Sequence, residues 1–468
     1  ELELEPTEVK AFMNGMGAFQ SQTYGEFGIP PGTPPKEIQQ MMGDFGGYWM
    51  EAAPFLPQRL QTQEVIGAFG QGPNLAIGPV MQIWEMDPSL VDEMAETMSG
   101  RMTTAMSGDM FGQMFDHMGI TGANGDEFFE EMGQNWVEPF GDPNFYPPDF
   151  FPPAHMKDAM MAPGPAMSAA FNADVTAFGG HFGFDPKASE GQAFLGDMGS
   201  AFAAGPMEAM KANSQKEGGY FEFGDMAALG KSMSQDVFGT YGHFPPEMGF
   251  DQNAIQGMQQ GMYEEFVAFS GDFGLPADAT KSMLNSFEQG MDAVYEGGFL
   301  GADGAPPPWA EELDYTAMGN NFDSQKNDWM KAGMEEAGPG VEFGFTVDEF
   351  VAQSTQMDQA FDLCVPKTSE GKAVCEAVKN SKGEQACQWL TWGGGTTGTC
   401  DPKMDDFMGD MPTDFMVGPN MGPNMGPNTG PNTHGTGPNM GPNTHGTGTN
   451  MGPNTHGTTT MGTTGQGG

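Results

Sequence analysis

Residues 118–136 read MGITGANGDEFFEEMGQNW, and their pattern recurs along the chain. Each copy begins with Phe or Met, then Gly, then Ile, Leu or Phe, and has large apolar residues at its fifteenth and nineteenth positions. We call this 19-residue pattern the frame. Its four regular copies start at Met118, Met248, Phe273 and Phe343, a fifth with a two-residue insertion starts at Phe182, and a looser sixth starts at Phe27. Such repetition predicts a chain built from duplicated helical units.

The apolar residues of the frame follow helical spacing. In the first copy, Phe128, Met132 and Trp136 stand four residues apart, which keeps them near one side of a helix. The Gly at the second position favours the left-handed conformation that ends helices. We therefore expect the frame to separate one helix from the next. The predicted fold class is mainly α, with short, irregular amphipathic helices in repeated units and long loops between them.

The composition indicates which side chains fill the core. Leu, Ile and Val are few, whereas Met occurs 42 times and Phe 37 times. Met is flexible and polarizable, so it fills irregular apolar gaps. From Met94 to Met118 it occupies every fourth position, and Gly100, Gly108 and Gly112 interrupt this run. Because each Gly weakens a helix by about 1 kcal/mol relative to Ala, we expect a weak or broken helix here.

Changes in composition divide the chain into seven regions. The predicted regions are 1–136 (Met- and Phe-rich helices), 137–180 (a Pro-rich linker), 181–296 (helical repeats), 297–342 (a Gly- and Pro-rich loop region), 343–362 (the last helical repeat), 363–402 (a small Cys module) and 403–468 (a tail). The linker and loop predictions rest on clustered prolines, which punctuate regular structure. We predict that the tail is disordered, because repeats of Gly, Pro, Asn and Thr cannot form a core.

The four cysteines, Cys364, Cys375, Cys387 and Cys400, lie within 37 residues. An even number in a tight cluster is typical of two disulfides in a small extracellular module, and three pairings are open. A zinc site is the alternative. Zinc-binding cysteines usually stand about two to four residues apart, whereas the steps here are 11, 12 and 13. We therefore predict disulfides and a secreted protein, and a chain that begins at Glu1 fits a processed form or a fragment.

The charge of the chain limits its partners. Only 17 residues are basic and 63 are acidic, for a net charge of -46. We predict no nucleic-acid binding, because neutralising phosphates requires Lys and Arg, and for the same reason no binding to anionic membranes. No stretch approaches the ~18 apolar residues of a transmembrane helix. Divalent cations, another protein or further copies of this chain remain as partners.

Clustered methionines raise a metal-binding hypothesis. Thioethers are soft ligands that suit Cu(I). His117 stands beside Met114 and Met118, and these three are the predicted metal-ligating residues. The alternative, which we favour, is that Met replaces Leu in apolar contacts. We predict no resident cofactor; weak association of copper, or of calcium with the acidic surface, stays open.

The sequence predicts a protein that is not an enzyme, because the signatures G-x-S-x-G, H-E-x-x-H and C-x-x-C are absent. We predict instead a secreted, acidic, methionine-rich structural or matrix-type protein, located in the extracellular space, that associates with itself or with cations. Two alternatives stay open. One is a copper-binding protein, and the other is an amphipathic coat protein whose helices lie on an apolar surface.

Overall fold

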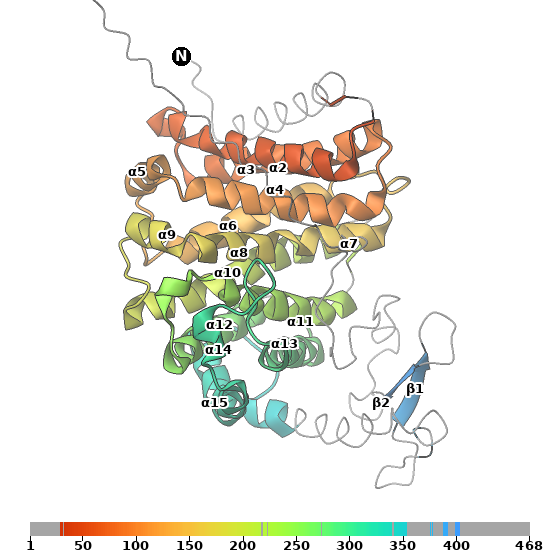
Figure 1. Ribbon diagram of the computed structural model, residues 1–468. Coiled ribbons are helices and arrows are strands. Elements are labelled where there is room, and N and C mark those ends of the chain that lie inside the picture. Colours follow the sequence, from red (N-terminus) through yellow and green to blue (C-terminus); the bar gives the residue numbers. More distant parts are fainter. Residues whose placement is uncertain are drawn as a thin grey trace, which may run out of the picture. The chain divides into compact units, whose positions relative to one another are not determined.

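Two rows of packed helices make up most of the described chain (Figure 1). The computed structural model describes residues 29–352 except 31, 217, 218, 222, 273, 339 and 340, together with 375, 377, 387–391 and 398–402. The first row consists, in packing order, of α2 (Pro35–Glu51), α4 (Val91–Met106), α8 (Pro163–Ala173), α11 (Phe223–Gly239) and α13 (Ala277–Gly297). The second consists of α3 (Gln63–Ile83), α6 (Gly125–Val137), α10 (Ser189–Ser214), α12 (Gln252–Asp272) and α15 (Tyr315–Glu336).

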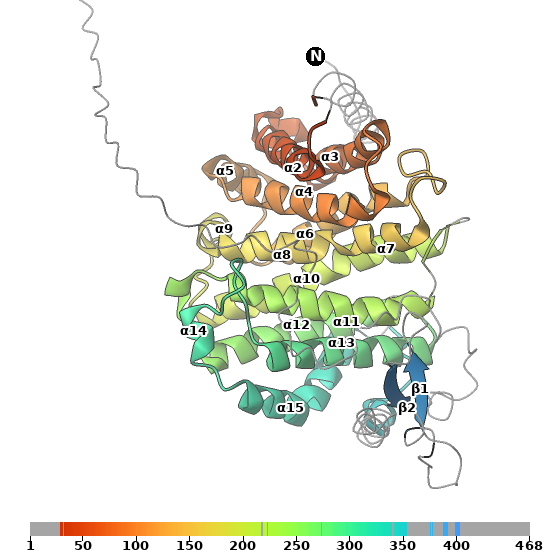
Figure 2. The ribbon, with the colours of Figure 1, turned by 45° about the vertical axis from the view of Figure 1, so that its right-hand side comes forward.

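Shorter elements connect the helices of these rows. They are the helices α5 (Asp109–Met118), α7 (Pro153–Met161), α9 (Val175–Phe182) and α14 (Pro308–Glu311), and the 3-10 turns η2 (Ala53–Phe55), η3 (Gln58–Leu60), η4 (Pro88–Leu90), η5 (Glu138–Gly141), η6 (Thr240–His243) and η7 (Pro246–Met248). Figure 2 shows α4, α8, α11 and α13 following one another along the first row. We call the two rows together the helical stack. The prediction of a mainly α fold is confirmed.

Glycines at the second position of the frame have left-handed backbones. The φ angles are +75° at Gly119, +73° at Gly183, +62° at Gly249, +62° at Gly274 and +70° at Gly344. Four of these glycines precede α6, α10, α12 and α13, and the last precedes the helical residues 347–352. The expectation that these glycines separate successive helices is therefore confirmed. The duplication of units stays a prediction.

Methionine and phenylalanine fill the core between the two rows. The stripe on α4, Met94, Met98, Met102 and Met106, is at most 1% exposed although it winds around the helix. Burial on several sides is possible because α4 packs against α2, α3, α7 and α8. As predicted, the helix breaks before the stripe ends, and α5 begins only at Asp109.

Proline inside α3 is compensated by a distant tryptophan. Pro73 has no N–H, so the carbonyl of Phe69 loses its usual helical donor. The indole N–H of Trp49 donates to that carbonyl at 2.7 Å, and the Trp49 ring stacks on Phe69 at 4.9 Å. The hydrogen bond from α2 therefore compensates for Pro73 within this 21-residue helix.

Glycines inside the helices allow very close helix crossings. A Cβ at Gly205 of α10 would overlap the carbonyl oxygen of Glu130 on α6 and lie 2.9 Å from the Gln134 backbone nitrogen. At the next crossing, a Cβ at Gly196 would overlap the carbonyl oxygen of Met258 on α12 and lie 3.2 Å from Gly261 Cα. These positions admit no side chain unless the helices move apart.

A buried ion pair joins three helices of the stack. Glu288 on α13 accepts a hydrogen bond from Tyr263 Oη on α12 at 2.6 Å, and its second oxygen lies 3.0 Å from Lys326 Nζ on α15. The Glu288 side chain is 5% exposed and that of Lys326 is 15% exposed. Burial alone lowers the pKa of Lys326, but Glu288 and Asp323 more than reverse this and raise it above its ordinary value.

Two loop predictions are wrong. Residues 137–180 do not form a linker, because they contain η5, α7, α8 and most of α9. Residues 297–342 contain α14 and the 22-residue α15. Three of the prolines that suggested loops occupy first turns instead: Pro153, Pro163 and Pro308 are the first residues of α7, α8 and α14. The first turn tolerates proline because its N–H groups have no helical acceptor.

The expected shortness of the helices is also wrong, since α10 has 26 residues and α12 and α13 have 21 each. Several internal glycines of these helices, such as Gly196, Gly205 and Gly290, lie at close crossings between helices. No helix within the described ranges is long and apolar enough to cross a membrane. The predicted tail, 403–468, and the second half of the last repeat, 353–362, lie outside the described residues.

Part of the predicted Cys module is described. Strand β1 (Cys387–Thr391) pairs antiparallel with β2 (Gly398–Pro402), which places Trp389 opposite Cys400. Cys375 and Cys387 are buried and disulfide-bonded. Cys364 lies outside the described residues, and no bonded pair is defined within them. The pairing of the four cysteines therefore stays a prediction.

Candidate functional site

A group of carboxylates lies along the second row of helices. Its members are Asp126, Glu127 and Glu130 on α6, Asp197 on α10, Glu264 and Glu265 on α12, and Glu336 at the end of α15. We call these seven residues the acidic face. They come from four helices that pack one after another, so carboxylates far apart in the sequence contribute to one region of negative electrostatic potential.

Glu130 and Asp197 are the most affected members of the acidic face. Burial raises the pKa of Glu130 to about 7, and the charges of Glu208, Glu265 and Asp126 add to this shift. Burial also raises the pKa of Asp197 to about 7, with further contributions from Glu265 and Asp126. The same two effects, partial exclusion of water and neighbouring negative charge, therefore act on carboxylates of different helices.

Positive charge is scarce around these carboxylates. Helices α6 and α12 contain no Lys or Arg. Within the described part of the chain, no basic side chain forms an ion pair with Glu130, Asp197 or Glu265. A Cβ at Gly261 would lie 3.0 Å from Asp197 Oδ1, so the Asp197 carboxylate lies close to the α12 backbone. The close crossing of α10 and α12 thus accounts for its burial.

The acidic face extends over a considerable length. Packed helices lie about 8–10 Å apart, so the face covers roughly 25–30 Å from α6 to α15. Among the described residues, no group of three or more His, Cys, Asp or Glu is arranged to hold a metal ion. An extended arrangement suits a ligand with several spaced positive charges, since each interaction gains from neighbouring negative charge.

The predicted metal-ligating residues share the last turns of α5 but differ in exposure. Met114 is 2% exposed and belongs to the core, Met118 is half-buried, and His117 is exposed. The structure therefore does not present all three side chains to solvent together. Among the other described methionines, only Met110 is strongly exposed, at 45%. The copper hypothesis stays a prediction, and the burial pattern favours the role of Met in the core.

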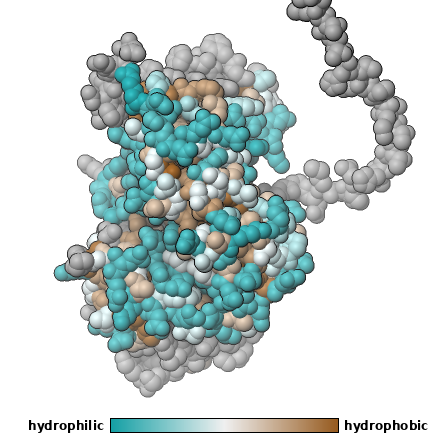
Figure 3. Space-filling model, turned by 90° about the vertical axis from the view of Figure 1, so that its left-hand side faces the viewer, coloured by the Kyte–Doolittle hydropathy of each residue, from teal (hydrophilic) through white to brown (hydrophobic). Residues whose placement is uncertain are grey.

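The surface bears on the coat-protein alternative. The exposed large hydrophobic side chains of the described residues are Tyr48, Phe55, Ile83, Met110 and Leu300. Figure 3 shows mostly hydrophilic residues on one side of the molecule, with small hydrophobic areas between them. Helices that lie on an apolar surface need a continuous apolar stripe facing outward. Among the described residues, Figure 3 shows no such continuous stripe on this side of the molecule. The coat hypothesis therefore stays a prediction.

The sequence interpretation did not identify the acidic face. Asp197 stands between Gly196 and Met198, which are both buried, and Glu130 directly follows the buried pair Phe128 and Phe129. An acidic residue flanked by core positions on a helix is a local indication of a partly buried carboxylate. The neighbouring charges from other helices cannot be found this way.

The acidic face makes stability depend on pH. The pKa of Glu130 rises from 4.5 to about 7 on folding, so the folded state binds protons more tightly than the unfolded state. The contribution of Glu130 to stability is complete below the unfolded pKa and is lost as pH rises from there through about 7. Glu130→Gln removes this loss, so at about pH 9 we expect the free energy of unfolding to increase by on the order of 1–2 kcal/mol and the thermal midpoint to rise, with little change at about pH 4.

The matched control is Glu127→Gln, which removes an exposed carboxylate from the same helix. We expect a much smaller effect at alkaline pH, because water already screens Glu127. Thermal unfolding followed by circular dichroism at both pH values gives the comparison. Equal effects of the two substitutions at alkaline pH would show that burial of Glu130 does not matter.

Comparison with known proteins adds no further constraint: no protein-family model matches this chain, and no curated protein matches it.

Proposed function

We propose that this protein is a secreted, acidic structural or matrix-type interaction protein whose acidic face binds a cationic partner. The observation that carries the proposal is the raised pKa, about 7, of both Glu130 and Asp197 on packed helices. Such carboxylates are held in an unfavourable environment that a bound cation would relieve. The cysteine pattern supports the extracellular part of the proposal.

Proton release is the distinctive consequence of this function. A positive charge brought near Glu130 and Asp197 lowers the pKa of each, so binding near neutral pH expels protons. Two groups that are each about half protonated can release roughly one proton in total. Affinity for the cation should therefore increase as pH rises from about 6 to about 8.

A defined polycation tests the proposal. We would titrate poly-L-lysine into the full-length protein by isothermal calorimetry, at low ionic strength, in two buffers that differ in ionisation enthalpy. The difference between the two heats measures the protons released. The variant Glu130→Gln/Asp197→Asn/Glu265→Gln should bind at least about tenfold more weakly and release almost no protons.

The control changes the net charge by the same amount elsewhere. Asp303, Glu311 and Glu312 are exposed and lie between α13 and α15 or in α14. The variant Asp303→Asn/Glu311→Gln/Glu312→Gln should bind poly-L-lysine almost as well as the parent and keep the proton release. If both triple variants weaken binding equally, net charge alone governs binding and the acidic face has no special role.

Self-association can be followed with the same two variants. Sedimentation velocity with and without calcium compares the size of each species. If cations join copies through the acidic face, calcium should increase the sedimentation coefficient of the parent and of the control variant only. An increase that persists in the acidic-face variant would assign the association to another surface.

A further inference from the structure

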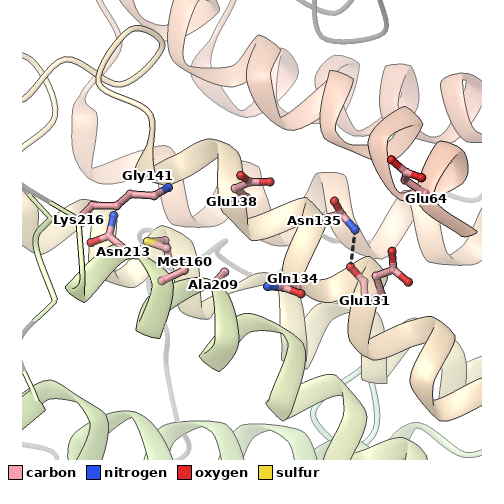
Figure 4. Close-up of a pocket in the computed structure, with 11 residues that line it drawn as sticks. Glu64, Glu131, Gln134, Asn135, Glu138, Gly141, Met160, Ala209, Asn213 and Lys216 are labelled. Carbon is pink, nitrogen blue, oxygen red and sulfur yellow. Dashed lines mark hydrogen bonds between the residues drawn. The ribbon is translucent and has the colours of Figure 1, made fainter. Parts of the chain in front are cut away.

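A polar pocket of about 360 Å³ lies between α6 and α10, and neither Glu130 nor Asp197 lines it. Its walls also include Glu64 from α3 and Met160 from α7. The volume is within the range of about 300–1,000 Å³ that is usual for small-molecule sites. Figure 4 shows that its polar side chains are distributed unevenly: Asn213 and Lys216 lie at one end, and Glu64 and Glu131 lie at the other.

The first end of the pocket offers hydrogen-bond donors. Asn213 is 2% exposed, and its Oδ1 accepts hydrogen bonds from the backbone N–H groups of Tyr220 at 2.8 Å and Phe221 at 3.4 Å. Because these donors fix the oxygen, the amide Nδ2 must face the other way. A Cβ at Gly141 would lie 2.8 Å from this nitrogen, so Nδ2 is directed toward the Gly141 wall of the pocket.

Asn213 Nδ2 forms no hydrogen bond within the described residues and borders the pocket. A donor at the wall of a pocket can be satisfied by water or by an acceptor group of a ligand. Lys216 lies beside it, and Figure 4 shows its side chain extending along the pocket. An ammonium group next to a free amide donor is suited to bind a carboxylate.

The second end of the pocket offers acceptors. The carboxylates of Glu64 and Glu131 form no ion pair with a basic side chain in the described ranges. Between the two ends, Gln71 holds the wall in place by donating to Asn135 Oδ1 at 3.1 Å and to Glu138 Oε2 at 2.9 Å. The arrangement is therefore rigid in the middle, with a positive end and a negative end.

We propose that this pocket binds a small amino acid with a cationic side chain. The carboxylate of the ligand would accept from Asn213 Nδ2 and Lys216, its α-amino group on the adjacent carbon would lie toward Glu138, and its cationic side chain would reach Glu64 and Glu131. Three glutamates and one lysine line the pocket, which favours a ligand of net positive charge over a neutral one. The inference goes beyond the proposed function, because it uses neither Glu130 nor Asp197.

Three related probes distinguish this proposal from general attraction of cations. L-arginine has the carboxylate and the cationic side chain, agmatine lacks the carboxylate, and L-citrulline lacks the side-chain charge. Calorimetry with the full-length protein at low ionic strength should rank L-arginine first. Agmatine should bind at least about tenfold more weakly although it carries more positive charge, and L-citrulline should also bind more weakly. Pure charge attraction would rank agmatine first, which would overturn the proposal.

Substitutions at the positive end sharpen the test. Asn213→Asp keeps the oxygen that accepts from Tyr220 and Phe221 but replaces the free donor by a negative oxygen. It should lower the affinity for L-arginine about tenfold and leave agmatine binding almost unchanged. Lys216→Gln, at an exposed position, should act in the same direction without a risk to folding.

The control substitution is Lys331→Gln on α15, where the lysine is 69% exposed and 3.9 Å from Glu335. It should leave the affinities for all three probes unchanged. Two results would overturn the proposal: saturable binding of none of the probes, or equal weakening of L-arginine and agmatine by Asn213→Asp and Lys216→Gln. Binding of poly-L-lysine at the acidic face is measured separately, so failure here leaves that result unaffected.

Discussion

Replacing Gly205 by alanine is expected to destabilise the helical stack by about 2–3 kcal/mol, although alanine is the better helix former. The added Cβ would overlap the Glu130 carbonyl oxygen and lie 2.9 Å from the Gln134 backbone nitrogen. Both are backbone atoms of α6, so no side chain can rotate away. Helices α6 and α10 would have to separate, and the contacts around Phe129 and Phe202, whose rings lie 5.4 Å apart, would weaken.

A matched substitution should have the opposite sign. A Cβ at Gly257 in α12 meets no atom within 4 Å. Gly257→Ala should therefore stabilise the protein by about 0.5–1 kcal/mol through the unfolded state and helix propensity. Thermal midpoints and hydrogen exchange of α6 and α10 measure both variants. If Gly205→Ala is as stable as the parent, the close crossing of α6 and α10 does not exist in solution.

Removal of the Lys326 ammonium is the second change with a large expected effect. Lys326→Met leaves the Glu288 carboxylate, 5% exposed, without the charge 3.0 Å away that balances it. Losing one partner of a buried pair costs about 3–5 kcal/mol, and the 15% exposure of Lys326 places the expected value near the lower limit. The thermal midpoint should fall by several degrees, and exchange should increase in α12, α13 and α15, which this cluster connects.

A second substitution separates lost charge balance from lost packing. Glu288→Gln in the Lys326→Met background removes the unbalanced charge and keeps an oxygen that can accept from Tyr263 Oη. The double variant should recover at least about half of the lost stability. The exposed pair of Lys331 and Glu335 provides the control, since Lys331→Met should change the midpoint little. A double variant as unstable as the single one would show that the charge of Glu288 is not the cause.

Several parts of the fold could be predicted because they depend on nearby residues. Phe128, Met132 and Trp136 were identified by their spacing, and all three are completely buried. The glycine of the frame was expected to end helices, and Gly119 has the required positive φ. Spacing along a helix and the conformation of a helix end are set within a few residues, so a short stretch of sequence contains the information.

Other parts could not be predicted, because a distant residue changes the meaning of a local one. Pro73 suggests an interrupted helix, but the Trp49 indole supplies the missing hydrogen bond at 2.7 Å. Pro163 and Pro308 suggest loops, but each occupies a first helical turn. The sequence shows that proline is unsuited to the middle of a helix. Whether a given proline breaks the helix depends on its position in the helix and on the donors that neighbouring helices supply.

The sequence alone determined that this chain is mainly helical, that Met and Phe form its core and that negative charge dominates its surface. These properties follow from composition and from periodicity within one or two helical turns. Only the tertiary structure decided which carboxylates, such as Glu130 and Asp197, are partly buried, and that the Asn213 side chain lines a pocket. Desolvation and charge coupling depend on which helices become neighbours, and residues far apart in the sequence determine that packing.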